Sequence, residues 1–438
     1  MAKVENAGIR KLALGLLCLI MISSFETFNP QLSGLSDDQL LQQGGDLKQQ
    51  IVAIVLWAGV MLLSFIPGVS RAPTSTRGML WPALLLTWVV ISPIWSMDPV
   101  ASGPKSLVFL LASLAAWRLA FVVTAEEMFT CIFYTLGGML LLSVLVVLLF
   151  PNVGLLLHDW QHEGQWKGIF GTKQGLGILS AIFLLLALLR ISYRRSLLNL
   201  LAGTIGLVCM LGAESRGAGI IALVAVGCLL IARSRPRMAS LVPLILLVDV
   251  ALGVTEILYF VITGNASFLV FGYDINLTER TYIWQYALRF WINQPFAGTG
   301  LNGFWTAPEI KPGFIRLHGW VLDNYHSGYL GIIIETGAVG LLLFCIVTVQ
   351  LVSKLRILLA NARVDRLSLE MTLGFVVMFF TINLSETYFL RSTNFFSVLF
   401  TFLLVKVLSK PHSVRRSART PSSYQQPPAM GMPAGRIL

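Results

Sequence analysis

Charged residues are scarce in this chain: only 12% are Asp, Glu, Lys or Arg, whereas 56% are hydrophobic. Such a composition cannot give a soluble domain a polar surface. The five cysteines all fall within apolar runs, which excludes a disulfide framework and the spacing of a metal site. A basic nucleic-acid domain and an internal repeat are also missing from the sequence. The alternating pattern of an outer-membrane barrel is absent as well, which leaves membrane helices.

Long apolar runs are what the chain does contain. Hydrocarbon about 30 Å thick needs roughly 20 apolar residues per helix. Twelve runs of suitable composition cover residues 11–25, 51–66, 79–95, 107–122, 128–150, 174–189, 196–212, 217–231, 241–262, 327–351, 372–384 and 394–408. The sequence therefore predicts an all-α polytopic membrane protein with about 12 transmembrane helices.

The loops between the predicted membrane helices alternate between few and many lysine and arginine residues. Cytoplasmic loops retain an excess of these residues, and a cytoplasmic N-terminus places most of the 32 of them inside. We therefore expect both termini on the cytoplasmic side of a bacterial inner membrane. The net charge of +11 then reflects topology and attraction to the cytoplasmic leaflet, so the expected partners include membrane lipids but no nucleic acid.

Four regions follow from the spacing of the runs. Residues 1–262 carry nine predicted membrane helices, and 263–325 form an extracytoplasmic segment large enough for a small cap. Within this cap, residues 280–292 place aromatic and aliphatic side chains at helical spacing, which indicates an interfacial helix. Residues 326–408 carry the last three membrane helices. The Ser-, Pro- and Arg-rich tail 409–438 is typical of disorder.

Outward cations violate the usual charge bias and indicate anionic ligands. Arg216 has the most specific setting, because residues 214–219 (ESRGAG) open a predicted membrane helix whose N-terminus faces outward. Free backbone amides there favour an anion, and a guanidinium can bind phosphate bidentately. A lipid-headgroup contact, or pairing with Glu214, is the alternative. The other outward cations include Lys167, Lys173, Arg280, Arg289, Lys311, Arg316 and Arg391.

His326 is the candidate for acid–base chemistry. It begins the segment 326–329 (HSGY) at the outward start of a long predicted helix, where a neutral imidazole can accept a proton. A helix cap or a packing role is the alternative. Glu335 and Asp249 are acids within predicted spans, and such residues are functional suspects. We expect Glu335 to support packing between helices and Asp249 to be a satisfied structural carboxylate.

Five segments, in order, resemble the O-antigen ligase and exopolysaccharide polymerase superfamily, especially its ExoQ-type branch. They are residues 91–99 (ISPIWSMDP), similar to S-x-x-W-S-x-x-P; residues 166–177 (WKGIFGTKQGLG), similar to W-R-G-x-x-x-H-K-N-x-L-G; residues 215–218 (SRGA); Arg280 and Trp284 with residues 295–300 (PFAGTG), similar to R-x-x-x-W…P-x-x-G-x-G; and His326 heading H-[NS]-x-x-L…E-x-G. The chain departs from the family in one place, where the usual His-Lys-Asn is Thr172, Lys173 and Gln174.

The resemblance implies a GT-C-like fold and a metal-independent inverting glycosyltransferase without a cofactor. It implies a lipid-diphosphate donor, undecaprenyl-diphosphate-linked oligosaccharide, used at the periplasmic face. The expected partners are a growing polysaccharide chain and, around the enzyme, a flippase and chain-length or export proteins. His326 is the expected base. The residues expected to bind the diphosphate are Arg216, Arg280 and Lys173, with supporting roles for Arg289, Trp284, Tyr329 and Glu335.

Three functions remain open on the sequence. A polymerase that joins lipid-linked repeats is favoured, because residues 166–170 resemble the exopolysaccharide branch more closely. A ligase that transfers the glycan to lipid A core, or to protein, uses the same donor with a different acceptor. A transporter or flippase of lipid-linked sugars is the third hypothesis. Transporters often show paired halves and broken midplane helices, whereas this chain shows no visible repeat and its candidate residues cluster at the outer surface.

Overall fold

The computed structural model describes residues 2–24, 47–65, 77–157, 162–263, 267–270, 273–276, 280–319, 324–361, 365–391 and 394–409. Most of the segment 27–50, and nearly all of the tail that is expected to be disordered, lie outside these residues. His158, Trp160 and Trp320 also lie outside them.

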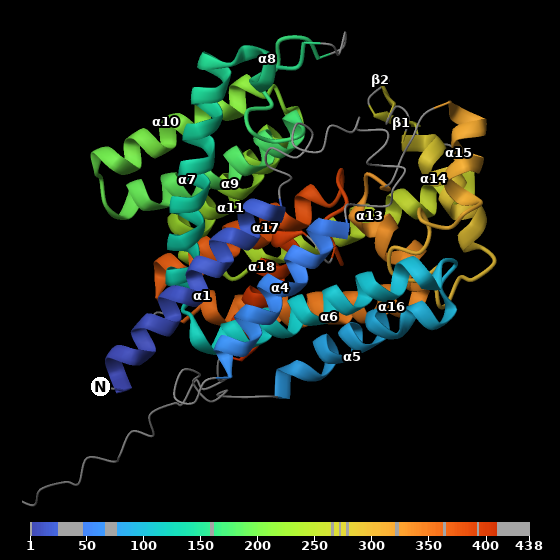
Figure 1. The fold of residues 1–438 in the computed structure, drawn as a ribbon, viewed down its shortest axis with the longest axis horizontal. Coiled ribbons are helices and arrows are strands. Elements are labelled where there is room, and N and C mark those ends of the chain that lie inside the picture. Colours follow the sequence, from blue (N-terminus) through green and yellow to red (C-terminus); the bar gives the residue numbers. More distant parts are fainter. Residues whose placement is uncertain are drawn as a thin grey trace, which may run out of the picture.

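Helices make up most of the described chain (Figure 1). The first half contains α1 (Ala2–Ser24), α4 (Leu47–Ser64), α5 (Leu80–Ile91), α6 (Pro99–Val122), α7 (Ala125–Leu149), α8 (Pro151–Gly154), α9 (Lys173–Tyr193) and α10 (Leu197–Gly212). The second half contains α11 (Arg216–Ser234), α12 (Pro236–Ala239), α13 (Ile245–Thr263), α14 (Arg280–Trp291), α15 (Ile310–His318), α16 (Gly328–Leu359), α17 (Arg366–Ile382) and α18 (Phe395–Leu408). Short 3-10 turns precede α5, α6 and α13.

The helical prediction is confirmed, and its membrane character is confirmed in part. Within the described ranges, six helices are long and apolar enough to cross a membrane: α6, α7, α9, α11, α16 and the segment Val242–Tyr259. Four shorter apolar segments accompany them: Ile51–Leu63, Leu80–Trp95, Leu197–Gly212 and Phe395–Leu408. Helices suit this setting because each backbone N–H and C=O finds its partner within the helix. The full count of twelve spans stays a prediction.

One small β-hairpin was not expected from the sequence. Strand β1 (Ser267–Val270) pairs antiparallel with β2 (Tyr273–Asn276), in the register Ser267 to Asn276. Each strand is only four residues long, which is too short to show a clear alternating pattern. The hairpin lies in the segment that also contains α14 and α15, beside these two helices in Figure 1.

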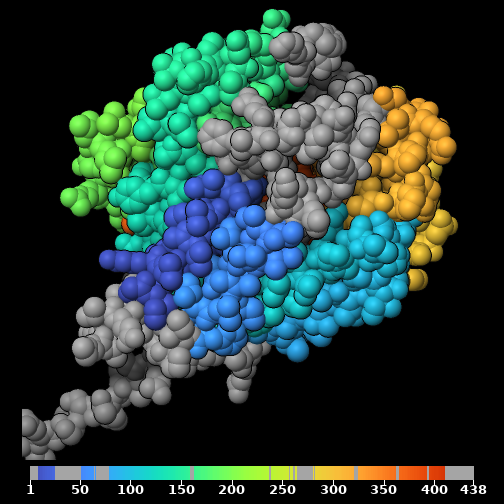
Figure 2. All heavy atoms as spheres, in the orientation of Figure 1, coloured from blue at the N-terminus to red at the C-terminus, as the bar shows by residue number. Residues whose placement is uncertain are grey.

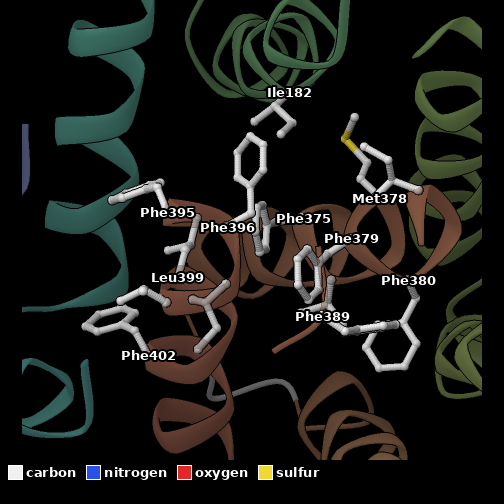
Figure 3. Packing of buried hydrophobic residues seen from close by; sticks show 14 of the residues in the cluster. Ile182, Phe375, Met378, Phe379, Phe380, Phe389, Phe395, Phe396, Leu399 and Phe402 are labelled. Atoms are coloured by element: carbon white, nitrogen blue, oxygen red, sulfur yellow. The ribbon is translucent and has the colours of Figure 1, made fainter. Parts of the chain in front are cut away.

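Aromatic side chains fill the core between α17, α18 and their neighbours. Figure 3 shows Phe375 of α17 beside Phe396 of α18, with Ile182 of α9 next to the Phe396 ring. The ring of Phe379 stacks on that of Phe400 in α18, with centroids 5.1 Å apart. Such pairs contribute beyond the area they bury, so this cluster fixes α17 against α9 and α18. In Figure 2 the N-terminal helices α1 and α4, in blue, cover another face beside α6.

The longest helix, α16, is broken at Gly337, where φ is +66°. The motif 295–300 docks against this break. The backbone N–H groups of Thr299 and Gly300 donate to the carbonyls of Ile334 and Glu335 at 2.8 and 2.9 Å. A Cβ atom on Gly337 would lie 2.1 Å from the carbonyl oxygen of Phe296. Glycine is therefore required at this position both for its φ and for the close approach.

Candidate active site

The first group of site residues lies at the start of α9. Thr172 caps the helix, because its hydroxyl accepts the N–H of Gly175 at 3.1 Å. Lys173 follows and is only 9% exposed. Its Nζ atom lies 2.8 Å from Nδ1 of His162 and donates to Oε1 of Gln165 at 2.6 Å. The lysine is therefore held by the turn at residues 162–166.

Arg216 begins α11, next to this lysine network. Ser215 caps α11 by accepting the N–H of Ala218 at 3.5 Å. Gly177 lets α9 approach closely, since a Cβ atom there would lie 2.5 Å from Cβ of Ser215. Glu214 has a φ of +48° and accepts the Nε2–H of Gln165 at 3.0 Å. A chain of hydrogen bonds thus joins Lys173 to the turn that presents the exposed Arg216 side chain.

Arg280 begins α14, and this helix is tied to the segment before His326. The indole N–H of Trp284 donates to the backbone carbonyl of Tyr325 at 2.9 Å. Arg280 precedes Trp284 by one helical turn, so the two share a face of α14. Trp284 is 1% exposed and Arg280 is half-buried. The tryptophan therefore fixes α14 against the residue before His326, and the arginine lies one helical turn before the tryptophan.

His326 lies just before α16 in a strained backbone conformation. Its φ is +48°, and its backbone N–H donates to Oδ1 of Asn324 at 2.8 Å. Ser327 caps α16 by accepting the N–H of Leu330 at 3.3 Å. The Nδ1 atom of His326 is buried and lies 3.6 Å from Oε2 of Glu386. Residues in such a conformation often occur at functional sites.

Asn383 holds the loop that carries Glu386. Its side chain is fully buried, and its Oδ1 atom accepts the backbone N–H groups of Tyr388 and Phe389, both at 2.9 Å. Its backbone carbonyl accepts the N–H of Gly328 at 2.8 Å. A Cβ atom on Gly328 would lie 2.0 Å from Oδ1 of Asn383, so the two segments pack without a gap. Asn383 therefore sets the position of Glu386 relative to His326.

A buried ion pair lies behind His326. Arg391 donates to Oε1 of Glu335 at 2.9 Å and also to the side-chain oxygen of Asn302. The exposed fractions of the Arg391 and Glu335 side chains are 16% and 3%. The guanidinium also lies 5.8 Å from the centre of the Tyr325 ring. Arg391 thus joins α16 to the loops at residues 302 and 325.

Backbone strain marks the same segments. Among the described residues, positive φ angles outside glycine occur at Glu214, Asn302, His326 and Leu390. Glu214 precedes the Arg216 helix, Asn302 and Leu390 flank the Arg391 pair, and His326 is the candidate base. Such conformations cost roughly 1–3 kcal/mol each and persist where surrounding contacts impose them.

Two tyrosines near His326 are unsuited to act as bases. Burial raises the pKa of the Tyr325 phenol well above its usual range, and the Glu335 carboxylate acts in the same direction. Burial also raises the pKa of the Tyr388 phenol, with a smaller contribution from Glu386. Both phenols therefore stay protonated at neutral pH, which leaves the imidazole as the better proton acceptor.

The two groups of polar residues lie at one end of the helical bundle. A small apolar pocket is lined by Ile178 of α9, Ala218 of α11, Ile382 of α17 and Phe396 of α18, with further apolar neighbours. Ile178 and Ala218 follow Lys173 and Arg216 closely, and Ile382 shortly precedes Glu386. The pocket therefore lies between the helix ends that present the lysine and arginine and those that frame His326.

The remaining predicted residues are placed as follows. Tyr329 is buried, its hydroxyl donates to the carbonyl of Phe380 at 3.2 Å, and its ring packs against Gly253. Arg289 is exposed near the end of α14. Asp249 is buried in α13 and accepts the hydroxyl of Thr381 at 3.1 Å. The structure thus gives Tyr329 and Asp249 packing partners inside the bundle.

Sequence reasoning missed Glu386, Asn302 and His162 as members of these groups, and it named Arg391 only as an outward cation. None of these residues belongs to one of the five family-like segments. The local signal for Glu386 was weak: it is an acid at the end of a predicted span. The contacts of Glu386, Asn302 and Arg391 come from distant parts of the chain, whereas His162 contacts Lys173, which lies only 11 residues further along.

The fold and the site together define a class of protein. It is a mostly helical membrane protein with cationic residues and a strained histidine at one end of the helical bundle. Residues 200–345 match the family model described as O-Antigen ligase. The chain is 23% identical, over 316 residues, to the exopolysaccharide production protein ExoQ of Rhizobium meliloti (strain 1021). This likeness covers 68% of the present chain and 70% of that protein. The resemblance to the O-antigen ligase and exopolysaccharide polymerase superfamily is therefore confirmed.

Proposed function

We propose that the protein is a glycan polymerase that joins undecaprenyl-diphosphate-linked oligosaccharide repeats at the periplasmic face of the inner membrane. The observation that carries the proposal is the strained His326 beside Glu386, at the bundle end that also presents Lys173 and Arg216. The outward placement rests on the positive-inside pattern. The proposal also includes twelve membrane spans, cytoplasmic termini and a periplasmic cap formed by residues 263–325.

The chemistry proposed is an inverting transfer without a metal. The Nδ1 atom of His326 faces Glu386, which leaves Nε2 to accept the proton of the acceptor hydroxyl. The hydroxyl oxygen then attacks C1 of the donor sugar and forms the new glycosidic bond. The bond from C1 to the diphosphate oxygen breaks, and the undecaprenyl diphosphate leaves with the electron pair. The proton remains on His326 until water removes it.

Cationic side chains stabilise the leaving diphosphate in this proposal. Arg216 is exposed at the start of α11, Arg280 is half-buried on the face of α14 that bears Trp284, and Lys173 lies beside the Arg216 turn. Guanidiniums fixed where negative charge develops lower the barrier, because they need no reorganisation during the reaction. The helix starts at Lys173 and Arg216 add backbone dipoles of the same sign.

A polymerase is favoured over a ligase by the likeness to a protein named for exopolysaccharide production. The matching family model is described as O-Antigen ligase, so transfer of the glycan to lipid A core, or to protein, is the second candidate. Both reactions use the same donor site. A transporter of lipid-linked sugars is the third candidate and needs no base.

The purified protein in liposomes separates these candidates. Given a lipid-diphosphate-linked repeat alone, a polymerase produces longer lipid-linked chains, which are resolved by size. Transfer that occurs only after lipid A core is added identifies a ligase. Movement of labelled lipid across the bilayer without any new glycosidic bond supports a transporter and overturns the proposal of a transferase.

A further inference from the structure

Lys173 is held by two side chains that come from the preceding turn. His162 contacts its Nζ through Nδ1 at 2.8 Å, and Gln165 contacts it through Oε1 at 2.6 Å. An ammonium group has only donors, so the Nδ1 atom of His162 must be the acceptor. Both contacts therefore fix the direction in which the lysine points.

The turn itself is firmly attached to the bundle. The N–H of Gly164 donates to the carbonyl of Leu156 at 2.8 Å, and the N–H of Leu156 donates back to Gln165 at 3.0 Å. The N–H of Trp166 donates to the carbonyl of Gly212 at 2.9 Å, and a Cβ atom on Gly212 would lie 2.4 Å from the Trp166 ring. The turn is thus anchored at the end of α10, beside the helix that Arg216 begins.

Gln165 connects the lysine to the arginine turn. Its carbonyl oxygen accepts from Lys173, and its amide N–H donates to Glu214 at 3.0 Å. The amide oxygen therefore faces Lys173 and the amide nitrogen faces Glu214, so these two contacts set the orientation of the amide. Through this side chain, the start of α9 and the strained residue before Ser215 are held as one unit.

The sequence lacks the residues that usually flank this lysine. The superfamily pattern is His-Lys-Asn, whereas here Thr172 precedes the lysine and Gln174 follows it. Thr172 is occupied as the cap of α9. An imidazole and an amide nevertheless contact Lys173, but from positions 162 and 165. The chemical groups are retained although their positions in the sequence differ.

We propose that His162 and Gln165 replace the missing histidine and amide of the motif and position Lys173 toward the donor diphosphate. This inference rests on the proposed function, because the diphosphate is its ligand. His162 and Gln165 are positioning residues in this scheme and do not touch the reacting atoms. Their loss is therefore expected to weaken donor binding more than it slows the chemical step.

The test measures KM for the lipid-diphosphate donor and kcat in liposomes. His162→Ala is expected to raise KM about tenfold, since hydrogen bonds to charged groups are among the stronger ones, with kcat changed less than about twofold. Gln165→Met keeps the size of the side chain and should raise KM similarly. The double variant should raise KM by less than the product of the two single changes, because both residues hold one lysine.

Rescue provides the sharper readout. Thr172→His added to His162→Ala restores the histidine of the family pattern and is expected to return KM most of the way to the wild-type value. Thr172→Ser keeps a capping hydroxyl and should not rescue. His318→Ala is the matched histidine control, because His318 lies at the end of α15 against Phe314. It should leave both constants unchanged.

Each outcome decides the inference. A wild-type KM in both His162→Ala and Gln165→Met overturns it while leaving the proposed function intact, since the wild-type enzyme is active in the same assay. A raised KM that Thr172→His does not lower also overturns the proposed replacement. An inactive wild-type protein refutes the proposed function instead. Thermal unfolding of each variant in detergent identifies a folding defect, and Gln165→Met then carries the test.

Discussion

The Nδ1 atom of His326 lies 3.6 Å from Oε2 of Glu386, although α16 and α17 separate the two residues in the sequence. The contact forms because Asn383 binds both the start of α16 and the loop that carries Glu386. A carboxylate at this distance stabilises the imidazolium that forms when Nε2 accepts a proton.

Glu386→Gln is therefore expected to lower kcat by about tenfold or more, since general-base catalysis contributes roughly 10²–10⁴-fold and depends on the orientation of the base. KM for the donor should change little, because the carboxylate does not contact the diphosphate in the proposed scheme. Steady-state kinetics in liposomes measure both constants. Glu309→Gln removes an exposed acid of the preceding segment and is the control. An undiminished kcat in Glu386→Gln would remove the carboxylate from the mechanism.

Arg216→Ala and Arg280→Ala should each lower kcat/KM by about 10²-fold or more, because each removes a fixed positive charge from the developing diphosphate anion. Lysine at either position should restore only part of the rate if the contact is bidentate. The matched control is Arg316→Ala, which removes an exposed guanidinium from α15. Wild-type kinetics in both alanine variants would refute the assignment of the diphosphate site.

The Glu335–Arg391 pair predicts a stability effect that is separate from chemistry. Removing one partner leaves a buried charge without compensation and costs about 3–5 kcal/mol, so Glu335→Gln and Arg391→Gln should each lower the unfolding temperature in detergent. The double variant should lose less than the sum of the single losses. Strictly additive losses would show that the two side chains do not stabilise each other.

Metal independence is tested with a chelator. The proposed stabilisers are guanidinium and ammonium groups, so EDTA should leave the rate of chain elongation unchanged. The measurement is the same product-size assay, run with and without the chelator. A reversible loss of activity that Mg²⁺ or Mn²⁺ restores would contradict a mechanism based on side-chain cations alone.

Local sequence patterns predicted the helices and the positions of several site residues within them. Residues 214–219 do open a helix, which begins at Arg216, and residues 280–291 do form a helix. These features depend on neighbours within one turn, which periodicity and capping rules can describe. The segments 215–218, 280–284 and 326–329 could therefore be located as helix starts from the amino-acid sequence alone.

The contacts that complete the site could not be predicted in this way. Glu386 reaches His326 from the far end of α17, Arg391 reaches Glu335 from beyond it, and His162 replaces a histidine expected at position 172. The first two contacts depend on how separate helices pack, and the third depends on how the turn at residues 162–166 folds back onto Lys173; a single sequence specifies neither. The helix predicted at the membrane interface, residues 280–292, buries Ile283 and Trp284, so its apolar side chains also pack within the protein.

The most direct test of the account compares wild type with His326→Ala in liposomes that contain a lipid-diphosphate-linked repeat unit alone, with products resolved by size. The proposed mechanism predicts longer lipid-linked chains from wild type and none from His326→Ala, while binding of the donor lipid to the variant is retained. Wild-type elongation by His326→Ala would contradict the assignment of His326 as the base.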